Sequence, residues 1–265
     1  MEKSNIGEKI KLLTGSGMWH TREAEGLPSV HLSDGPHGLR KQEEKERQNN
    51  VSLVSTCYPT ASALACSWDV TAAERLGRAV AKEAWNADVA VLLGPGINMK
   101  RSPLCGRNFE YFSEDPFLAG RLGAAYVSAA QGEDVAVSLK HFAANNQETN
   151  RQTSNSQIDE RALREIYLSA FEYVVKTARP ATVMASYNRL NGYYACENRH
   201  LLTEILREEW GFDGVVISDW GACADLAKAV KAGMDLEMPD SHGIHARKLK
   251  AALKAGETYL CKNSG

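Results

Sequence analysis

The stretch that decides the fold is residues 211–222, "GFDGVVISDWGA". Its centre, Gly214 followed by residues 215–217, is a short apolar run typical of a buried β-strand. The run leads directly into Asp219 and Trp220. An aspartate at such a position can cap the next helix, bind a cation or act as a nucleophile. The ends of the other predicted strands help to choose among these roles.

Five further segments have the apolar character of short strands and alternate with longer helical patterns. The segments are 29–34, 87–96, 133–142, 181–188 and 234–238. Continuous apolar strands are typical of parallel sheets that are covered on both faces. Apolar stripes at helical spacing follow in 158–177 and 201–206, and Thr71 with Glu74 predicts the start of an earlier helix. The alternation predicts right-handed βαβ units.

Chemically capable side chains stand at the ends of these strands. Asp34, the pair Lys140 and His141, Tyr187 and Asp219 each end a different apolar segment. An open doubly wound sheet would spread these residues along a line, whereas the strands of a barrel all end on one face, where active sites are built. We therefore predict an α/β fold of the (β/α)8 TIM-barrel-like type, with an incomplete or distorted barrel allowed.

The composition of the chain limits the classes of function that it can have. The chain has 265 residues, of which 43% are hydrophobic, so it can form a sizeable core. Its formal net charge of −2 argues against nucleic acid as a main partner, because binding to the phosphate backbone needs a basic excess. The mixed charges of residues 41–50 are typical of a solvated loop. The first residues include no apolar stretch long enough for a signal peptide or membrane anchor, so we expect a cytoplasmic protein without membrane contact.

Cofactor signatures are absent from the sequence. The six cysteines form no CxxC pair and are expected to be free thiols. Neither a GxGxxG nor a GxxxxGK[ST] motif follows a strand, and no cluster has the spacing of metal ligands. We predict no cofactor and no metal.

Each candidate residue also has an ordinary structural interpretation. Asp219 could cap a helix that begins near Ala222, and the Asp34 segment could be a simple β-turn. His141 could be a hydrogen-bonded core histidine. Trp220 favours a functional reading, because an indole at a strand end can pack against the face of a sugar. The polar and aromatic stretch 102–120, which has no helical or strand period, is typical of a functional loop.

Five segments together resemble glycoside hydrolase family 3, β-glucosidase type. They occur in the family's order and their resemblance extends to about residue 256: "HLSDGPHGLR" (31–40), "GPGINMKRSPLCGRNFEYFSEDP" (94–116), "LKHFAANNQETNRQ" (139–152), "MASYNRLNG" (184–192) and "WGFDGVVISDWGA" (210–222). The resemblance implies a barrel domain over residues 1–256, followed by an unmatched tail at 257–265.

The resemblance also implies a role for each matching residue. Asp219 would be the catalytic nucleophile of a retaining enzyme that removes terminal non-reducing β-D-glucosyl residues from a β-glucoside or oligosaccharide through a covalent glycosyl-Asp219 intermediate. Trp220 would pack against the bound sugar. The residues implied to hold its hydroxyl groups are Asp34, Arg107, Lys140, His141, Arg151 and Tyr187.

One catalytic part of the family pattern has no match. In the β-glucosidase type, the acid/base residue comes from a C-terminal α/β sandwich domain, which this sequence does not contain. In the N-acetylglucosaminidase type it is a histidine in the loop that here reads "NNQETNRQTSN" (145–155) and contains none. We therefore expect this chain alone to be inactive or strongly impaired.

Several alternatives stay open. The chain could be a catalytically impaired sugar-binding barrel or one half of a split enzyme, completed by a sandwich domain in trans or associating as a homo-oligomer. A lyase or aldolase that uses Lys140 in a Schiff base is weaker, because His141 and the carboxylates surround the lysine. The preferred glycone and linkage are not decided.

Overall fold

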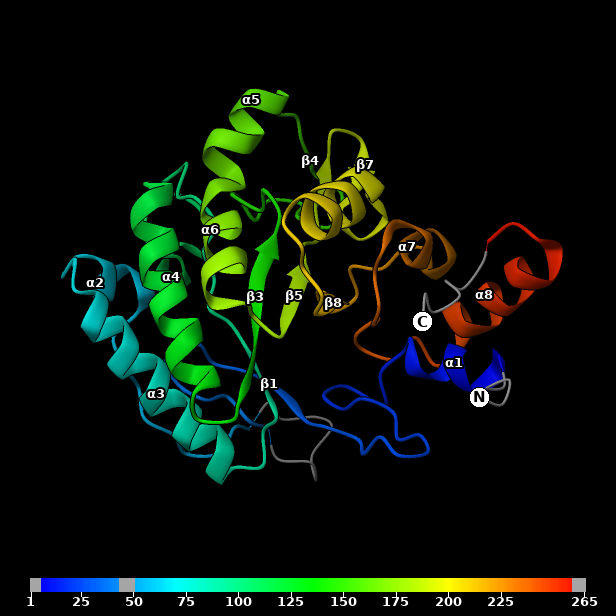
Figure 1. The fold of residues 1–265 in the computed structure, drawn as a ribbon, viewed down its shortest axis with the longest axis horizontal. Helices are drawn as coiled ribbons and strands as arrows, with labels where there is room; N and C mark the ends of the chain where they lie inside the picture. The colour runs from blue at the N-terminus through cyan, green and yellow to red at the C-terminus, as the bar shows by residue number, and fades with distance from the viewer. Residues whose placement is uncertain (1–5, 43–50, 259–265) are drawn as a thin grey trace.

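A five-stranded parallel sheet forms the centre of the molecule in the computed structural model, which describes residues 6–42 and 51–258. The strands are β1 (Leu32–Asp34), β2 (Val91–Leu93), β3 (Ala136–Phe142), β5 (Thr182–Ala185) and β8 (Val215–Ser218). They lie side by side in chain order, and β3, β5 and β8 can be followed in Figure 1. Most of the charged loop predicted at 41–50, Cys261 and the end of the tail lie outside the described residues.

Five of the six predicted strand segments contain one of these strands. The sixth, residues 234–238, does not form a strand and makes only isolated bridges, such as the parallel bridge between Ile217 and Leu236. The reason is local. The Asp235 carboxylate accepts the Val216 N–H at 2.7 Å, so a side chain takes the donor that a ladder would pair with a backbone carbonyl.

The sheet has the order of a barrel wall but is not closed by a continuous ladder. In the described part of the chain, β1 and β8 do not pair with each other. The gap contains residues 234–238 and the N-terminal segment, joined by isolated bridges between Thr14 and Glu237 and between His20 and His31. The fold is therefore α/β and TIM-barrel-like, with the incomplete wall that the prediction allowed.

Three helices cover the outer face of the sheet. They are α3 (Val70–Asn86), α4 (Pro116–Gln131) and α6 (Ser169–Ala178), and α4 packs between the other two (Figure 1). The N-cap of α3 is Asp69, whose side chain accepts the Thr71 N–H at 2.8 Å. The prediction that Thr71 and Glu74 start this helix was therefore wrong, because Asp69, two residues before Thr71, is the N-cap.

The remaining elements are short or lie at the edges. The helices are α1 (Ile6–Leu12), α2 (Ala61–Ala65), α5 (Glu160–Ala162), α7 (Leu226–Ala232) and α8 (Ile244–Ala255), with 3₁₀ turns at Asn108–Glu110 and Ala195–Glu197 and π-helical stretches at Leu163–Tyr167 and His200–Glu209. A small second sheet contains β4 (Asn155–Ser156), β6 (Arg189–Leu190) and β7 (Tyr193–Tyr194). None of the helices in the described residues is long and apolar enough to cross a membrane.

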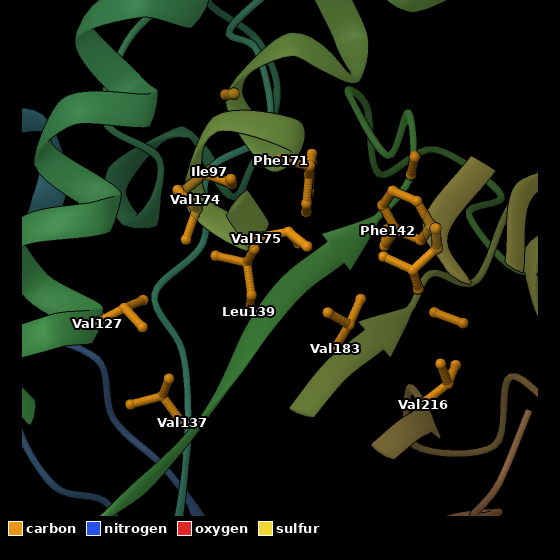
Figure 2. Close-up of a cluster of buried hydrophobic side chains, with 14 of the residues drawn as sticks. Ile97, Val127, Val137, Leu139, Phe142, Phe171, Val174, Val175, Val183 and Val216 are labelled. Carbon is orange, nitrogen blue, oxygen red and sulfur yellow. The ribbon is translucent and has the colours of Figure 1, made fainter. Parts of the chain in front are cut away.

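Two apolar layers lie on opposite faces of the sheet. The outer layer, between sheet and helices, includes Val137, Leu139, Val183 and Val216 and is drawn in part in Figure 2. The inner layer lies inside the wall and consists of Leu32, Val91, Leu93, Met184, Ile217, Leu236 and Met238. Successive residues of a strand point to opposite faces, so Val183 and Val216 face the helices while Met184 and Ile217 face inward.

Candidate active site

A pocket of about 490 Å³ lies at the carboxyl ends of the strands. Its lining includes seven of the eight residues predicted for the site: Asp34, Arg107, Lys140, Arg151, Tyr187, Asp219 and Trp220. The eighth, His141, lies buried behind the lining and contacts Arg107. The predicted convergence of the strand ends is therefore observed. The chemical roles of these residues stay predictions.

Asp219 does not cap the helix that follows it. That helix, α7, is capped by Asp225, whose carboxylate accepts the Ala227 and Lys228 N–H groups. The Asp219 side chain is instead buried at the pocket, where its Oδ1 accepts the Trp220 N–H at 2.7 Å. Its Oδ2 is buried and has no hydrogen-bond partner among the described residues. One carboxylate oxygen is therefore left for a ligand.

The surroundings of Asp219 act on its pKa in opposite directions. Burial raises the pKa, while the positive charges of Arg107 and Lys140 lower it, and the net shift is upward. The nearest cation is Arg107, whose Nη1 lies 3.9 Å from Asp219 Oδ2. Asp219 is thus a more basic carboxylate than an exposed one.

His141 is neutral and its tautomer follows from its partners. Its Nε2 lies 2.7 Å from Arg107 Nη2, and a guanidinium can only donate, so Nε2 accepts. The proton is therefore on Nδ1, which donates to the Tyr111 hydroxyl at 3.0 Å. Burial, together with the positive charges of Arg107 and Lys140, holds the pKa of His141 well below its usual value. The 3.6 Å approach of Nε2 to Asp219 Oδ2 is for this reason not an ion pair.

Lys140 is buried between two carboxylates. Its Nζ lies 3.3 Å from Asp34 Oδ1 and 3.5 Å from Glu110 Oε2. Burial lowers the pKa of Lys140, but the two negative charges raise it further than that, so the net shift is upward. Burial raises the pKa of the Glu110 carboxyl, but the positive charges of Lys140 and Arg107 lower it further than that, so the net shift is downward. Both partners are therefore charged, and Glu110 also accepts from Arg107 Nε.

Aromatic side chains form another part of the lining. The Arg151 guanidinium lies over the Tyr187 ring, 4.4 Å from its centroid, and the Tyr187 hydroxyl donates to the Trp220 carbonyl at 2.9 Å. The Trp220 ring lies 5.2 Å from that of Trp19. Its Nε1–H donates to the Met18 carbonyl at 2.8 Å, which fixes the orientation of the indole.

Sequence reasoning missed several lining residues: Trp19, His37, Arg40, Phe109, Glu110 and Met184. Phe109 and Glu110 fall in the stretch 102–120, which the sequence predicts to be a functional loop, although of its members only Arg107 is predicted as a site residue. His37 and Arg40 lie in the matched segment 31–40. Trp19 stands outside every matched segment, and nothing in the local sequence marks it.

The described residues also contain free thiols and one group of side chains that could bind a cation. The cysteines in the described residues are free, as predicted. Within residues 6–42 and 51–258, three side chains that could hold a cation come together, Cys223, Glu237 and His245. None of them belongs to the pocket lining.

Comparison with known proteins places this chain in a family. The sequence profile described as "Glycosyl hydrolase family 3 N terminal domain" matches residues 36–262. The thermostable β-glucosidase B of Acetivibrio thermocellus is 52% identical over 261 residues, which are 97% of this chain and 35% of that protein. An exo-α-(1→6)-L-arabinopyranosidase of Bifidobacterium longum is 50% identical over 242 residues, 89% of this chain and 32% of that one.

The solved structures that this chain resembles are also β-glucosidases. The family 3 β-glucosidase of Bifidobacterium adolescentis superposes with a TM-score of 0.90 at 46% identity, covering 97% of this chain and 37% of that chain. β-Glucosidase 3B of Thermotoga neapolitana in complex with glucose gives a TM-score of 0.91 at 40% identity, over 96% and 39%. The chain spans about a third of the length of the curated relatives it matches. With its TIM-barrel-like fold and its profile match over residues 36–262, the chain belongs to glycosyl hydrolase family 3, in which it corresponds to the N-terminal domain.

Proposed function

We propose that this chain is the sugar-binding, nucleophile-bearing part of a retaining β-glycosidase that removes terminal non-reducing β-D-glucosyl residues. The observation that carries the proposal is the buried Oδ2 of Asp219, which has no hydrogen-bond partner among the described residues and lies beside Arg107. A buried oxygen without a partner lowers the stability of a fold. Its presence therefore points to a ligand or a reaction that uses it.

The reaction follows from a carboxylate in this position. Asp219 Oδ2 attacks the anomeric carbon while the bond from that carbon to the leaving oxygen breaks, through an oxocarbenium-like transition state. The leaving oxygen takes a proton from a general acid. Water, deprotonated by the same group, then hydrolyses the glycosyl ester, and two inversions give net retention. The upward pKa shift of Asp219 makes it a better nucleophile for the first step.

The other lining residues suit a polyhydroxylated ring. Asp34 and Lys140 offer a charged acceptor and a charged donor at one place, and hydrogen bonds to charged groups are stronger than neutral ones. Arg151 and Tyr187 provide further donors, and the Trp220 indole provides an apolar face. His141 acts behind them, because it holds Arg107 in position.

No described lining residue is suited to be the general acid. The carboxyl groups besides Asp219 are Asp34 and Glu110, and both pair with Lys140. Lys140 and Arg107 lower the pKa of Glu110 despite its burial, and burial lowers the pKa of His37, so both groups favour their deprotonated forms at neutral pH. We propose that the acid/base group comes from outside these residues, from a further domain or another chain, and that this chain alone is inactive or strongly impaired.

The relatives leave two candidate glycones. Several matched proteins are named β-glucosidases, which favours glucose as the glycone. The arabinopyranosidase of Bifidobacterium longum, at 50% identity, makes L-arabinopyranose the second candidate. An aldolase that uses Lys140 is disfavoured, because the raised pKa of Lys140 keeps its amine protonated and unable to form a Schiff base.

The test uses a substrate that needs no acid. A 2,4-dinitrophenyl β-D-glucoside releases its phenolate without a proton, so Asp219 can be glycosylated even where no acid is present. We expect intact-mass spectrometry to show one added hexose, located by peptide mapping on the peptide that contains "VVISDW". The adduct should be lost in Asp219→Ala and kept in Asp213→Ala, an exposed aspartate of the same segment. Glucose binding without any adduct would instead support a sugar-binding barrel.

A further inference from the structure

We propose that Cys223, Glu237 and His245 form a binding site for one zinc ion, outside the sugar pocket. Their potential ligand atoms all lie within 4.8 Å of one another. The three residues come from separate parts of the chain: the loop between β8 and α7, the segment 234–238 and the first turn of α8. Their spacing in the sequence therefore has none of the regularity of a zinc motif.

The chemistry of the three side chains suits zinc. Thiolate, imidazole and carboxylate are the ligands that zinc takes in proteins. One thiolate and one carboxylate balance the charge of Zn²⁺, and a neutral imidazole adds none. The complex is then neutral, which matters because a net charge is costly to bury. Zinc–ligand bonds of about 2.0–2.3 Å place the donors of a tetrahedral site roughly 3.5 Å apart, so small side-chain rotations close the group.

The Ser241 hydroxyl lies close enough to the group to be considered as a fourth ligand. Ser241 Oγ lies 3.4 Å from Glu237 Oε2 and accepts the His245 N–H at 3.2 Å, so a hydroxyl stands at the edge of the group. Either this oxygen or a water molecule can complete the tetrahedron, as in sites with three protein ligands. His245 gives the ion a way in, because its side chain is 18% exposed, while Cys223 and Glu237 are buried.

The metal-free arrangement already resembles a site that holds a cation. His245 Nδ1 and Glu237 Oε1 are joined by a hydrogen bond, and zinc would take the place of its proton. A metal-bound thiolate and a metal-bound imidazole nitrogen both lack the proton that the free groups carry. Binding therefore releases the thiol proton and the proton of the hydrogen bond between Glu237 and His245.

The position of the group suggests a structural task. Glu237 lies in the gap of the sheet, where its carbonyl accepts the Gly15 N–H and its own N–H donates to Leu13, each at 2.9 Å. The next carbonyl, of Met238, accepts the Gly221 N–H at 2.8 Å, from the loop that begins with Asp219. An ion at this point would fasten α8 and the gap segment to the loop that carries Asp219.

The test measures zinc directly and needs no sugar. The untagged chain is stripped with a chelator, dialysed against Zn²⁺, and analysed by elemental mass spectrometry and by thermal melting. We expect about one tightly bound ion per chain and a rise in Tm. Co²⁺ in place of Zn²⁺ should give the near-ultraviolet charge-transfer band of a cobalt–thiolate bond, and the band should vanish in Cys223→Ser.

Matched variants separate this site from chance binding. His245→Gln and Cys223→Ser should lose the ion and the Tm rise. Cys105→Ser, another buried free thiol, and His242→Asn, an exposed neighbouring histidine, should keep both. If Cys223→Ser fails to fold by circular dichroism, the more exposed His245→Gln decides. No stoichiometric binding, no thiolate band, or unchanged binding in His245→Gln would overturn the proposal and leave Glu237 and His245 as an ordinary ion pair.

Discussion

Asp219 combines burial, a negative charge and one oxygen without a partner among the described residues, each of which acts against stability. The cations Arg107 and Lys140 compensate only in part, since the pKa of Asp219 remains raised. Active sites commonly give up stability in this way for reactivity. The charges around Asp219 therefore have consequences that can be measured without any substrate.

We expect Asp219→Asn to raise Tm at pH 7. A carboxyl whose pKa is higher in the folded state stabilises the fold when protonated, and this contribution is lost as the pH rises through the folded-state pKa. Asparagine is uncharged at every pH, so its advantage should be largest at neutral pH. It should shrink as the pH falls toward the pKa of an unfolded aspartate, about 3.9. Calorimetry at pH 7 and pH 4 measures both, with exposed Asp213→Asn as control. A lower Tm at pH 7 would show that Arg107 and Lys140 outweigh burial.

Asp34→Ala should weaken glucose binding far more than it disturbs folding. The Asp34 side chain is 37% exposed, and Lys140 keeps Glu110 as a partner after the change. Hydrogen bonds to charged groups contribute roughly 1.5–3 kcal/mol, which corresponds to about 10- to 100-fold in affinity. Isothermal titration with glucose and thermal melts measure the two effects, and Glu114→Ala, an exposed change, is the control. Unchanged affinity would remove Asp34 from the sugar site.

At the scale of elements, the strands divide their side chains between two layers. Val183 and Val216 face the helices, while Met184 and Ile217 face inward. The helices then pack closely against one another outside this sheet. In α3, Gly77 lies so near to α4 that a Cβ atom would stand 2.4 Å from the Tyr126 carbonyl oxygen. Backbone atoms cannot move aside as a flexible side chain can.

Gly77→Ala should therefore destabilise the fold, although alanine favours helices. Overpacking of this kind typically costs about 1–3 kcal/mol, part of which the helix propensity of alanine offsets. Urea unfolding measures the difference. Gly106→Ala, where an added Cβ meets nothing within 4 Å, should leave stability nearly unchanged. Equal stability of the two variants would mean that α3 and α4 can separate without cost.

At the scale of the whole molecule, the pocket joins segments that are distant in the sequence. Trp220 donates to the carbonyl of Met18, 202 positions away, and Lys140 reaches Asp34 across 106 positions. Of the carboxyl groups in the described lining, Asp34 and Glu110 pair with Lys140, and Asp219 is buried. The pocket thus brings together the proposed nucleophile and the residues proposed to bind the sugar, and in this proposal turnover depends on the source of a proton.

We expect the 265-residue chain to show negligible turnover of cellobiose. A departing sugar alkoxide needs a proton, and general acid–base help typically contributes about 10²–10⁴-fold. With the dinitrophenyl glucoside we expect a burst of phenolate and then a stall, because in the proposed function the base that activates water for the second step does not come from the described lining. Stopped-flow absorbance and glucose release measure the two substrates. Rapid steady hydrolysis of cellobiose would mean that a residue of this chain supplies the acid.

The sequence by itself determined the features that depend on neighbouring residues. Apolar runs mark the strands, and five motifs identify the family. Even here competition between neighbours misled the prediction, since Asp69 rather than Thr71 caps α3 and Asp235 interrupts a ladder at 234–238. Only the tertiary structure decided that Glu110 neutralises Lys140, that His141 stands neutral behind Arg107, and that Cys223 meets Glu237 and His245. These features depend on which distant side chains share a desolvated space, and burial and charge act through space rather than along the chain.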